Sequence, residues 1–193
     1  MSVISIMIVG VGGQGSLLAS RILGAALQGQ GHDVKISEVH GMSQRGGSVV
    51  TYVKYGEAVA SPIVEQGEAD WILAFELLEA ARWLPFLKPG GCMIVNTQKI
   101  DPMPVITGAA GYPEGVVEAL RNAGAPVTAL DALALAQEAG SPKAVNVVLL
   151  GTLASRMQLP LAVWQEAIRK TVPEKFLAMN TKAFDLGYHA PAM

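Results

Sequence analysis

The fold is decided by the stretch VISIMIVGVGGQGS, which spans residues 3–16 of the 193-residue chain. Residues 3–9 form an apolar run rich in β-branched side chains, which is typical of a strand buried on both faces. The glycines that follow have the spacing GxGxxG, and apolar residues then recur at helical spacing as far as Gln30. A buried strand, a glycine turn and a helix in this order predict the first unit of a Rossmann-like fold.

Short apolar segments alternate with helical patterns along the rest of the chain. We expect strands at residues 34–37, 48–55, 70–75, 93–96 and 126–130. We expect helices at residues 77–84, 115–123, 132–139, 144–158, 161–171 and 176–186, with Asp131 as the N-cap of the third. These elements predict an α/β fold, a three-layer Rossmann-like domain with a mixed, mainly parallel sheet and a helical C-terminal part.

Three local patterns add detail to this prediction. The segment between the first two strands is long enough for a right-handed parallel crossover. Gly56 and Glu57 predict a tight turn that pairs strand 48–55 with residues 58–61 as a hairpin. The sequence KPGG at residues 88–91 predicts the end of a helix, and residues 98–113, with their prolines and glycines, predict a loop.

Composition excludes several classes of protein. Hydrophobic residues make up 51% of the chain and charged residues 16%, against roughly a quarter charged in an average domain, so the chain is not disordered. With 14 Lys and Arg against 16 Asp and Glu, the net charge of -2 argues against a nucleic-acid partner. One cysteine and three scattered histidines provide ligands for neither an iron–sulfur cluster nor a structural zinc.

The uncharged stretches of the chain also bear on its location. Residues 1–20 carry no charge, but the apolar run at 3–9 is too short for a signal peptide and no basic segment precedes it. Residues 102–113 and 144–155 are uncharged but too short to cross a bilayer. We therefore expect a cytoplasmic protein with no membrane partner. The low charge predicts a face covered by another chain, including part of residues 144–155.

The glycine turn is the first candidate site. Its glycines allow a tight turn and close backbone approach, and the first N–H groups of the helix suit a phosphate or carboxylate. An acidic residue follows the second strand, 23 positions after Gly15, where dinucleotide folds place the acid that binds a ribose. The pattern is equally compatible with close packing of strand and helix and no ligand. The candidate binding residues are Gly10, Gly12, Gly13, Gln14, Gly15, Ser16 and Glu38.

A second candidate loop, HGMSQRGG at residues 40–47, follows the second strand. The carboxyl ends of parallel strands share one sheet edge, so this loop is expected to face the glycine turn and form one anion-accepting cleft with it. Arg45 offers a guanidinium beside backbone N–H groups, or alternatively braces Glu38. His40 is either a general base or a hydrogen-bonded structural histidine. The candidate residues here are His40, Ser43, Gln44, Arg45, Gly46 and Gly47.

The sequence contains no sign of a self-sufficient active site. There is no defensible Ser–His–Asp arrangement, no lysine in the glycine loop to make a Walker A site, no HExxH motif and no pair of cysteines. We therefore assign no catalytic residue and no metal ligand.

Several segments together resemble a known family. They are GVGGQG at 10–15, SEVHGMSQRGGSV at 37–49, LKPGG at 87–91 with VNT at 95–97, and NVVLLG at 146–151. These segments closely resemble the gamma-type domain of 2-oxoacid:ferredoxin oxidoreductases. The likeness runs from about residue 6 to residue 187, so we expect a single gamma-type oxidoreductase domain at 1–187 and a C-terminal tail at 188–193.

The resemblance implies a subunit of an enzyme that oxidatively decarboxylates an aryl 2-oxoacid such as indolepyruvate. That enzyme passes the acyl group to coenzyme A and sends electrons to ferredoxin. In this family a larger partner subunit holds thiamine diphosphate and the iron–sulfur clusters, and this chain lacks both the Gly-Asp-Gly motif and the cysteines for them. We expect a subunit inactive alone, with no firmly bound cofactor, whose glycine edge faces coenzyme A or the partner.

Other interpretations stay open on the residues themselves. The chain could be a stand-alone NAD(P)- or flavin-binding oxidoreductase that uses Gly10, Gly12, Gly15 and Glu38. It could instead be a nucleotide-binding regulatory module without turnover. When isolated, it could also form a homo-oligomer through its apolar surface.

Overall fold

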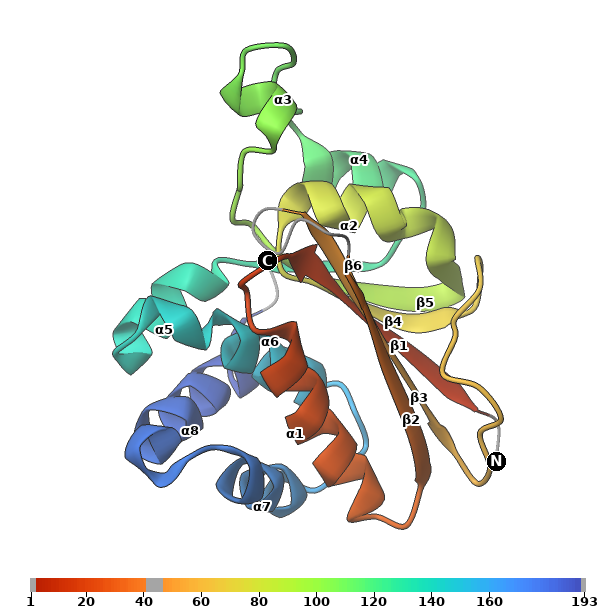
Figure 1. Ribbon diagram of the computed structural model, residues 1–193, viewed down its shortest axis with the longest axis vertical. Helices are drawn as coiled ribbons and strands as arrows, with labels where there is room; N and C mark the ends of the chain where they lie inside the picture. The colour runs from red at the N-terminus through yellow and green to blue at the C-terminus, as the bar shows by residue number, and fades with distance from the viewer. Residues whose placement is uncertain (1–2, 41–46, 192–193) are drawn as a thin grey trace.

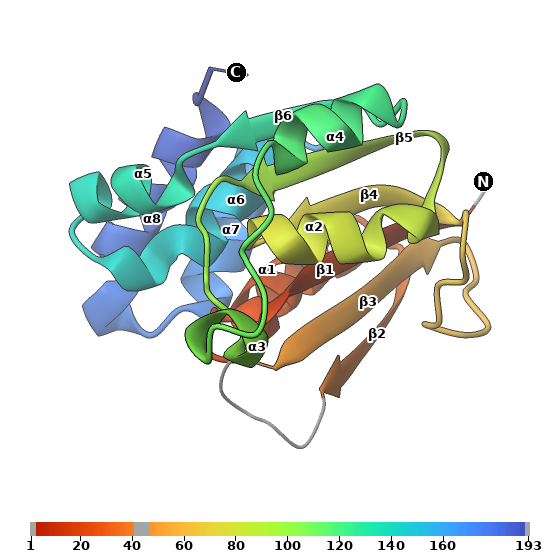
Figure 2. The ribbon, with the colours of Figure 1, turned by 90° about the horizontal axis from the view of Figure 1, so that it is seen from above.

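The computed structural model describes residues 3–40 and 47–191. A twisted sheet forms the central layer, and helices cover both of its faces (Figures 1 and 2). Its strands lie in the order β2-β3-β1-β4-β5-β6. The strands are β1 Ile4–Val11, β2 Asp33–His40, β3 Ser48–Gly56, β4 Ala69–Ala74, β5 Leu87–Asn96 and β6 Val127–Leu130. This arrangement confirms the predicted three-layer α/β fold.

The sheet is mixed, as predicted, but its strand pairing differs in two ways. β1, β4, β5 and β6 pair in parallel, whereas β3 is antiparallel to both β1 and β2. β2 therefore runs in the direction of β1, but β3 lies between them. The predicted hairpin between β3 and residues 58–61 is wrong, because β1 and β2 already occupy both edges of β3. Residues 58–61 form no strand, and the Val59 N–H instead donates to the Asp33 carboxylate at 2.8 Å.

The helices agree with the sequence pattern except at three places. The helices are α1 Ser16–Gln28, α2 Leu77–Trp83, α3 Met103–Ile106, α4 Val116–Asn122, α5 Ala132–Ala139, α6 Val145–Ala154, α7 Leu161–Thr171 and α8 Glu174–Tyr188. Asp131 caps α5 as predicted, accepting from the Ala134 N–H at 2.9 Å. The predicted loop 98–113 contains the short α3, and α6 ends four residues before the predicted position 158.

The third difference concerns residues 88–91, which lie inside β5 rather than before it. The pairing of β4 with β5 shifts register between Ala69 and Trp71, so this segment forms a bulge. Gly90 has a φ of 82°, and a Cβ on Gly91 would lie 2.7 Å from the Ala69 carbonyl oxygen. The bulge therefore requires these two glycines, and they do not mark the end of a helix.

Each face of the sheet has its own apolar core. Ile6, Ile8 and Leu73 point to the face covered by α1 and α5–α8, and Met7 and Val9 point to the face covered by α2 and α4 (Figures 1 and 2). All five side chains are buried. β1 is therefore a strand buried on both faces, as its apolar run predicted.

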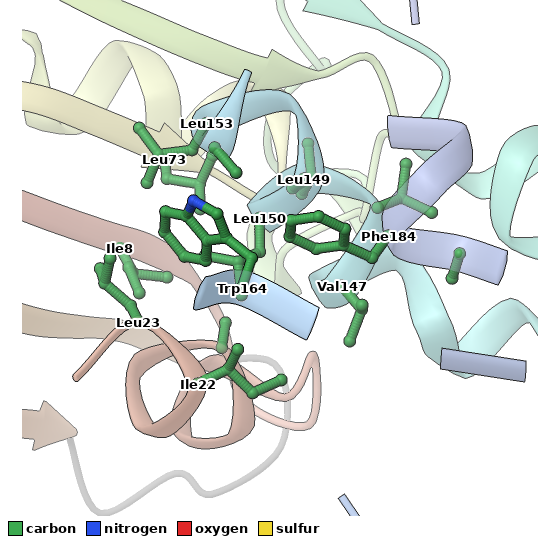
Figure 3. Packing of buried hydrophobic residues seen from close by; sticks show 14 of the residues in the cluster. Ile8, Ile22, Leu23, Leu73, Val147, Leu149, Leu150, Leu153, Trp164 and Phe184 are labelled. Atoms are coloured by element: carbon green, nitrogen blue, oxygen red, sulfur yellow. The ribbon is translucent and has the colours of Figure 1, made fainter. Parts of the chain in front are cut away.

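The larger core is centred on α6, in which every residue is buried. Trp164 and Phe184 pack beside it with ring centroids 5.9 Å apart (Figure 3). Gly151 of α6 and Gly187 of α8 face each other's backbone so closely that a Cβ on either would overlap the facing carbonyl. The prediction that residues 144–155 contribute a face to another chain is wrong for α6, because this chain's own helices cover it.

Candidate functional site

The predicted site lies at the sheet edge where β1, β2, β4 and β5 end. The Gly12 N–H donates to the Gly47 carbonyl oxygen at 2.9 Å, so the glycine turn and the start of β3 are in direct contact. Residues 41–46 lie outside the described residues. The roles predicted for Ser43, Gln44, Arg45 and Gly46 therefore stay predictions, including both alternatives for Arg45.

The Gln14 side chain fills the glycine turn from within. Its Oε1 accepts from the Val11 N–H at 2.8 Å, and its Nε2 donates to the Phe75 carbonyl oxygen at 3.0 Å. A Cβ on Gly10 would lie 2.7 Å from that Oε1 and 3.0 Å from the Phe75 Cβ, so a larger residue there would have to displace the Gln14 amide. Both polar groups of Gln14 are engaged within the chain, which makes this side chain a brace of the turn.

The last glycine of the motif joins α1 to α6. Gly15 has a φ of 83°, and a Cβ there would lie 2.6 Å from Asn146 Nδ2. That amide nitrogen donates to the Gly15 carbonyl oxygen at 3.0 Å. Asn146 is not among the predicted site residues, although a polar residue at the start of an apolar helix indicates that its side chain needs a partner.

The part of the turn that remains open is Gly13. Its φ is 97°, it is exposed, and nothing lies within 4 Å of the position of a Cβ. α1 begins at Ser16, and no side chain caps its first turn in the described part of the chain. Backbone N–H groups at an uncapped helix start suit an anionic group. The anion-binding capacity of this turn thus comes from its backbone.

Glu38 and Ser16, both candidate binding residues, lie together at this edge and bind each other. The Ser16 hydroxyl donates to Glu38 Oε2 at 2.9 Å, and the Thr51 hydroxyl donates to the same oxygen at 3.1 Å. Ser16 and Glu38, together with Gly12, Gly13 and His40, line a small hollow of about 170 Å³. A carboxylate in this hollow disfavours an anion on that side of the turn.

A larger cavity, of about 500 Å³, lies on the other side of Gly13. Gln98, Ile100 and Lys143 line it together with the turn. Lys143 forms no ion pair with any residue in 3–40 or 47–191. The sequence pattern does not point to Lys143 or Gln98, because the lysine reaches this cavity only through the packing of the 3-10 turn Pro142–Ala144 against α5 and α6. A free ammonium makes this cavity the more suitable one for an anion.

One side of this cavity, Gln98 and Ile100, belongs to an arm, residues 98–113, that stands away from the body of the protein (Figure 1). Both ends of the arm attach to the buried carboxylate of Glu76: the Ile100 N–H donates to Oε1 at 3.2 Å, and the Tyr112 hydroxyl donates to the same atom. Burial, and then the hydrogen bond to Glu76, raise the pKa of the Tyr112 phenol. Glu76 also caps α2 through the Glu79 N–H at 3.0 Å.

Asn96 connects the arm to the glycine turn. Its Nδ2 donates to the Phe75 carbonyl oxygen at 3.0 Å and to Gln98 Oε1 at 3.3 Å. Gln14 donates to the same Phe75 oxygen, so turn, strand end and arm share one hydrogen-bond network. Such a network fixes the geometry of this edge.

The described residues contain no group of three or more His, Cys, Asp or Glu side chains that could hold a metal ion. Cys92, the single cysteine, lies half-buried in β5. No helix among residues 3–40 and 47–191 is both long and apolar enough to span a membrane.

Residues 5–190 match the family model described as pyruvate ferredoxin/flavodoxin oxidoreductase, and the chain therefore belongs to this family. Within it, the chain is 45% identical to indolepyruvate oxidoreductase subunit IorB of Thermococcus kodakarensis over 193 residues, which cover 96% of this chain and 95% of that protein. The subunit of the same name from Archaeoglobus fulgidus is 40% identical over 190 residues, covering 96% and 94%. The predicted resemblance to this family is confirmed, and these relatives are named as indolepyruvate oxidoreductase subunits.

Solved structures share the fold. The gamma subunit of keto/oxoacid ferredoxin oxidoreductase from Geobacter sulfurreducens has a TM-score of 0.72 at 24% identity and covers 96% of each chain. The 2-oxoglutarate:ferredoxin oxidoreductase of Magnetococcus marinus, solved with 2-oxoglutarate, coenzyme A and succinyl-CoA bound, has a TM-score of 0.72 at 22% identity. The match covers 97% of our chain and 31% of that longer one. At these identities the likeness is one of fold.

Proposed function

We propose that this chain is a subunit of a 2-oxoacid:ferredoxin oxidoreductase that acts on indolepyruvate or another arylpyruvate. The complex would decarboxylate the 2-oxoacid oxidatively, transfer the acyl group to coenzyme A as an arylacetyl-CoA, and pass the electrons to ferredoxin. The observation that carries this proposal is the 45% identity to the indolepyruvate oxidoreductase subunit over 96% of the chain. The proposed compartment is the cytoplasm.

The residues of this chain do not fit the cofactors of such a complex. One cysteine cannot ligate an iron–sulfur cluster, and the sequence has no Gly-Asp-Gly motif for thiamine diphosphate. We therefore assign thiamine diphosphate and the clusters to a larger partner subunit, through which ferredoxin is also reduced. On this assignment the isolated chain has no oxidoreductase activity.

The glycine edge is the part of this chain that we assign to ligand or partner contact. The residues assigned to it are Gly10, Gly12, Gly13, Gln14, Gly15, Ser16, Glu38, His40, Ser43, Gln44, Arg45, Gly46 and Gly47. Among the described ones, Gln14 and Glu38 hold the edge in shape, whereas Gly13 and the start of α1 offer free backbone. A phosphate of coenzyme A, or the partner near its thiamine site, would approach the backbone here beside Lys143.

Two contacts favour the subunit over a stand-alone dinucleotide enzyme. The Glu38 carboxylate that would bind a ribose already accepts from Ser16 and Thr51. The turn that would approach a pyrophosphate is filled by Gln14. Binding of a dinucleotide in the usual way would break hydrogen bonds at both positions, and each broken bond costs about 1 kcal/mol.

Co-purification tests the proposal. A tagged copy of the chain, isolated from its native host, is expected to bring down a larger subunit that contains thiamine diphosphate and iron. The isolated chain is expected to show little or no affinity for NAD or flavin. Recovery of the chain alone, or turnover of indolepyruvate by the chain alone, would contradict the proposal.

A further inference from the structure

A second cavity, of about 460 Å³, lies at the opposite edge of the sheet from the glycine turn. Its walls come from Ile4 at the start of β1, Tyr55 near the end of β3, Trp71 in β4, and Met157 and Leu159 in the connection between α6 and α7. At about 3.3 Å per residue, the length of β1 separates this cavity from the glycine turn by roughly 20 Å. The two sites are therefore separate.

The polar side chains that line this cavity are not engaged. The side chains of His32, Arg156 and Gln158, and the Tyr55 hydroxyl, form no hydrogen bond or ion pair within the described part of the chain. Arg156 and Gln158 are exposed, so water solvates them in the free protein. Their polar groups remain available to a ligand that enters this largely apolar cavity.

The cavity has the charge and shape for an aromatic anion. Its described lining includes the Arg156 guanidinium and no acidic side chain. The nearby Asp70 carboxylate already accepts from the Ser5 N–H at 2.8 Å and pairs with Lys88. Trp71 and Tyr55 present aromatic rings, and His32 packs edge-on against Tyr55 at 5.2 Å between ring centroids.

Tyr55 also provides a hydrogen-bond donor. Burial, and then the charge of Asp70, raise the pKa of the Tyr55 phenol above its ordinary value of 10.0, and a phenol is protonated at neutral pH even without that shift. The hydroxyl can therefore donate to a carboxylate bound beside it. The volume of about 460 Å³ lies within the range of small-molecule sites.

We propose that this cavity binds a small aromatic carboxylate, with the ring against Trp71 and Tyr55 and the carboxylate on the Arg156 guanidinium. A guanidinium fork binds a carboxylate through two parallel hydrogen bonds, and an aromatic ring suits the apolar wall. The inference rests on this cavity alone and goes beyond the proposed function. If both hold, a molecule of the substrate's chemical class, an aromatic carboxylate, binds this subunit away from the site of reaction.

Titration calorimetry on the full chain tests the proposal with three probes. Indole-3-acetate has both ring and carboxylate, indole has the ring alone, and acetate has the carboxylate alone. We expect saturable binding of indole-3-acetate with one site per chain, at least tenfold weaker binding of indole, and no saturation by acetate at the same concentrations. Failure of indole-3-acetate to saturate at millimolar concentration would overturn the proposal.

Variants locate the site. Arg156→Gln is expected to weaken indole-3-acetate binding about ten- to a hundredfold, because a charge-assisted contact is lost. Arg169→Gln is the matched control, since that exposed arginine on α7 pairs with Glu166 and does not line the cavity; binding is expected to be unchanged. Equal binding by wild type and Arg156→Gln, or loss of binding in Lys143→Gln at the glycine edge, would place the ligand elsewhere and overturn the proposal.

This result is independent of the co-purification result. Binding is measured on the isolated chain, so it needs no partner subunit. A chain that recovers no partner but binds indole-3-acetate through Arg156 would contradict only the proposed function. A chain that recovers its partner but fails the titration would contradict only the cavity proposal.

Discussion

The two edges of the sheet differ in how their polar side chains are used. At the carboxyl edge, which carries the glycine motif, the Gln14 amide and the Glu38 carboxylate are bound within the chain. At the amino edge, which carries no motif, Arg156 and Gln158 face a cavity without a partner among the described residues. A motif therefore marks where the backbone is shaped, whereas unengaged side chains mark where a ligand can find new partners.

Substitution of the glycines of the turn is expected to give the largest change in the free energy of unfolding. Gly10→Ala places a methyl group against Phe75 and Gln14, and we expect it to lower the free energy of unfolding by about 2–4 kcal/mol. Gly13→Ala meets no atom, so only its left-handed backbone is strained, at about 1–2 kcal/mol. Urea denaturation of both variants measures this. A larger loss in Gly13→Ala than in Gly10→Ala would mean that the turn is not closed from within.

The next test concerns charge at the carboxyl edge. If Arg45 contacts the ligand, Arg45→Ala in the assembled complex is expected to cost about 1.5–3 kcal/mol, or roughly ten- to a hundredfold in rate with coenzyme A. Lys143→Gln is expected to shift the coenzyme A saturation curve in the same direction, because its ammonium faces the adjoining cavity. The melting temperature is expected to stay unchanged in both. An unchanged saturation curve with a lowered melting temperature in Arg45→Ala would support the brace on Glu38 instead.

Two tyrosines differ in whether their hydroxyl has a hydrogen-bond partner among the described residues. Tyr112→Phe removes a donor from the buried Glu76 and is expected to lower the free energy of unfolding by about 1–2 kcal/mol. Tyr55→Phe removes a hydroxyl that has no partner among the described residues and is expected to change it by less than about 0.5 kcal/mol. Thermal denaturation at pH 7 measures both. Equal losses would remove the distinction between the two edges.

The same tyrosines give a pH dependence. The pKa of each is raised in the folded protein above its ordinary value of 10.0, by burial first and by a neighbouring carboxylate second. The resulting stabilisation is fully present below about pH 10 and is lost as the pH rises through the folded pKa. In a titration followed at 295 nm, Tyr55 and Tyr112 are expected to ionise at a higher pH than a free tyrosine does. Normal ionisation of Tyr112 in the folded protein would contradict its contact with Glu76.

A last pair of variants removes one hydroxyl at the carboxyl edge and one amide at the amino edge. Ser16→Ala removes one of two hydroxyls that donate to Glu38 and is expected to lower the free energy of unfolding by about 1 kcal/mol. Gln158→Ala, at the amino edge, is expected to lie within about 0.5 kcal/mol of wild type. A loss in Gln158→Ala as large as that in Ser16→Ala would mean that its amide is engaged after all.

Local patterns in the sequence predicted the elements well, because periodicity and glycine spacing are local properties. The strand, turn and helix at residues 3–30 needed nothing else. Strand pairing is not local, and the placement of β3 between β1 and β2 depends on which edges are free. The low charge of 144–155 was assigned to an outer face because composition cannot distinguish a surface covered by a partner from one covered by the chain itself.

The site was predicted in part for the same reason. The order of strands and turns in the sequence predicts that the glycine turn, Ser16 and Glu38 share one edge of the sheet, and in the structure they do. Whether a side chain there is free depends on its neighbours in space. The sequence therefore predicts Gln14 and Glu38 as ligand-binding residues, although other groups of the chain already occupy their hydrogen-bonding atoms. Lys143 and the Arg156 cavity follow from the packing of loops that no motif marks.

The central claim is that this chain functions only within a larger complex, and reconstitution tests it most directly. Reduction of ferredoxin would be followed with indolepyruvate and coenzyme A in three samples: this chain alone, the co-purified larger subunit alone, and the two mixed. We predict turnover in the mixture and none by this chain alone, because it lacks ligands for an electron carrier. Turnover by this chain alone, or equal turnover by the larger subunit with and without it, would contradict the claim.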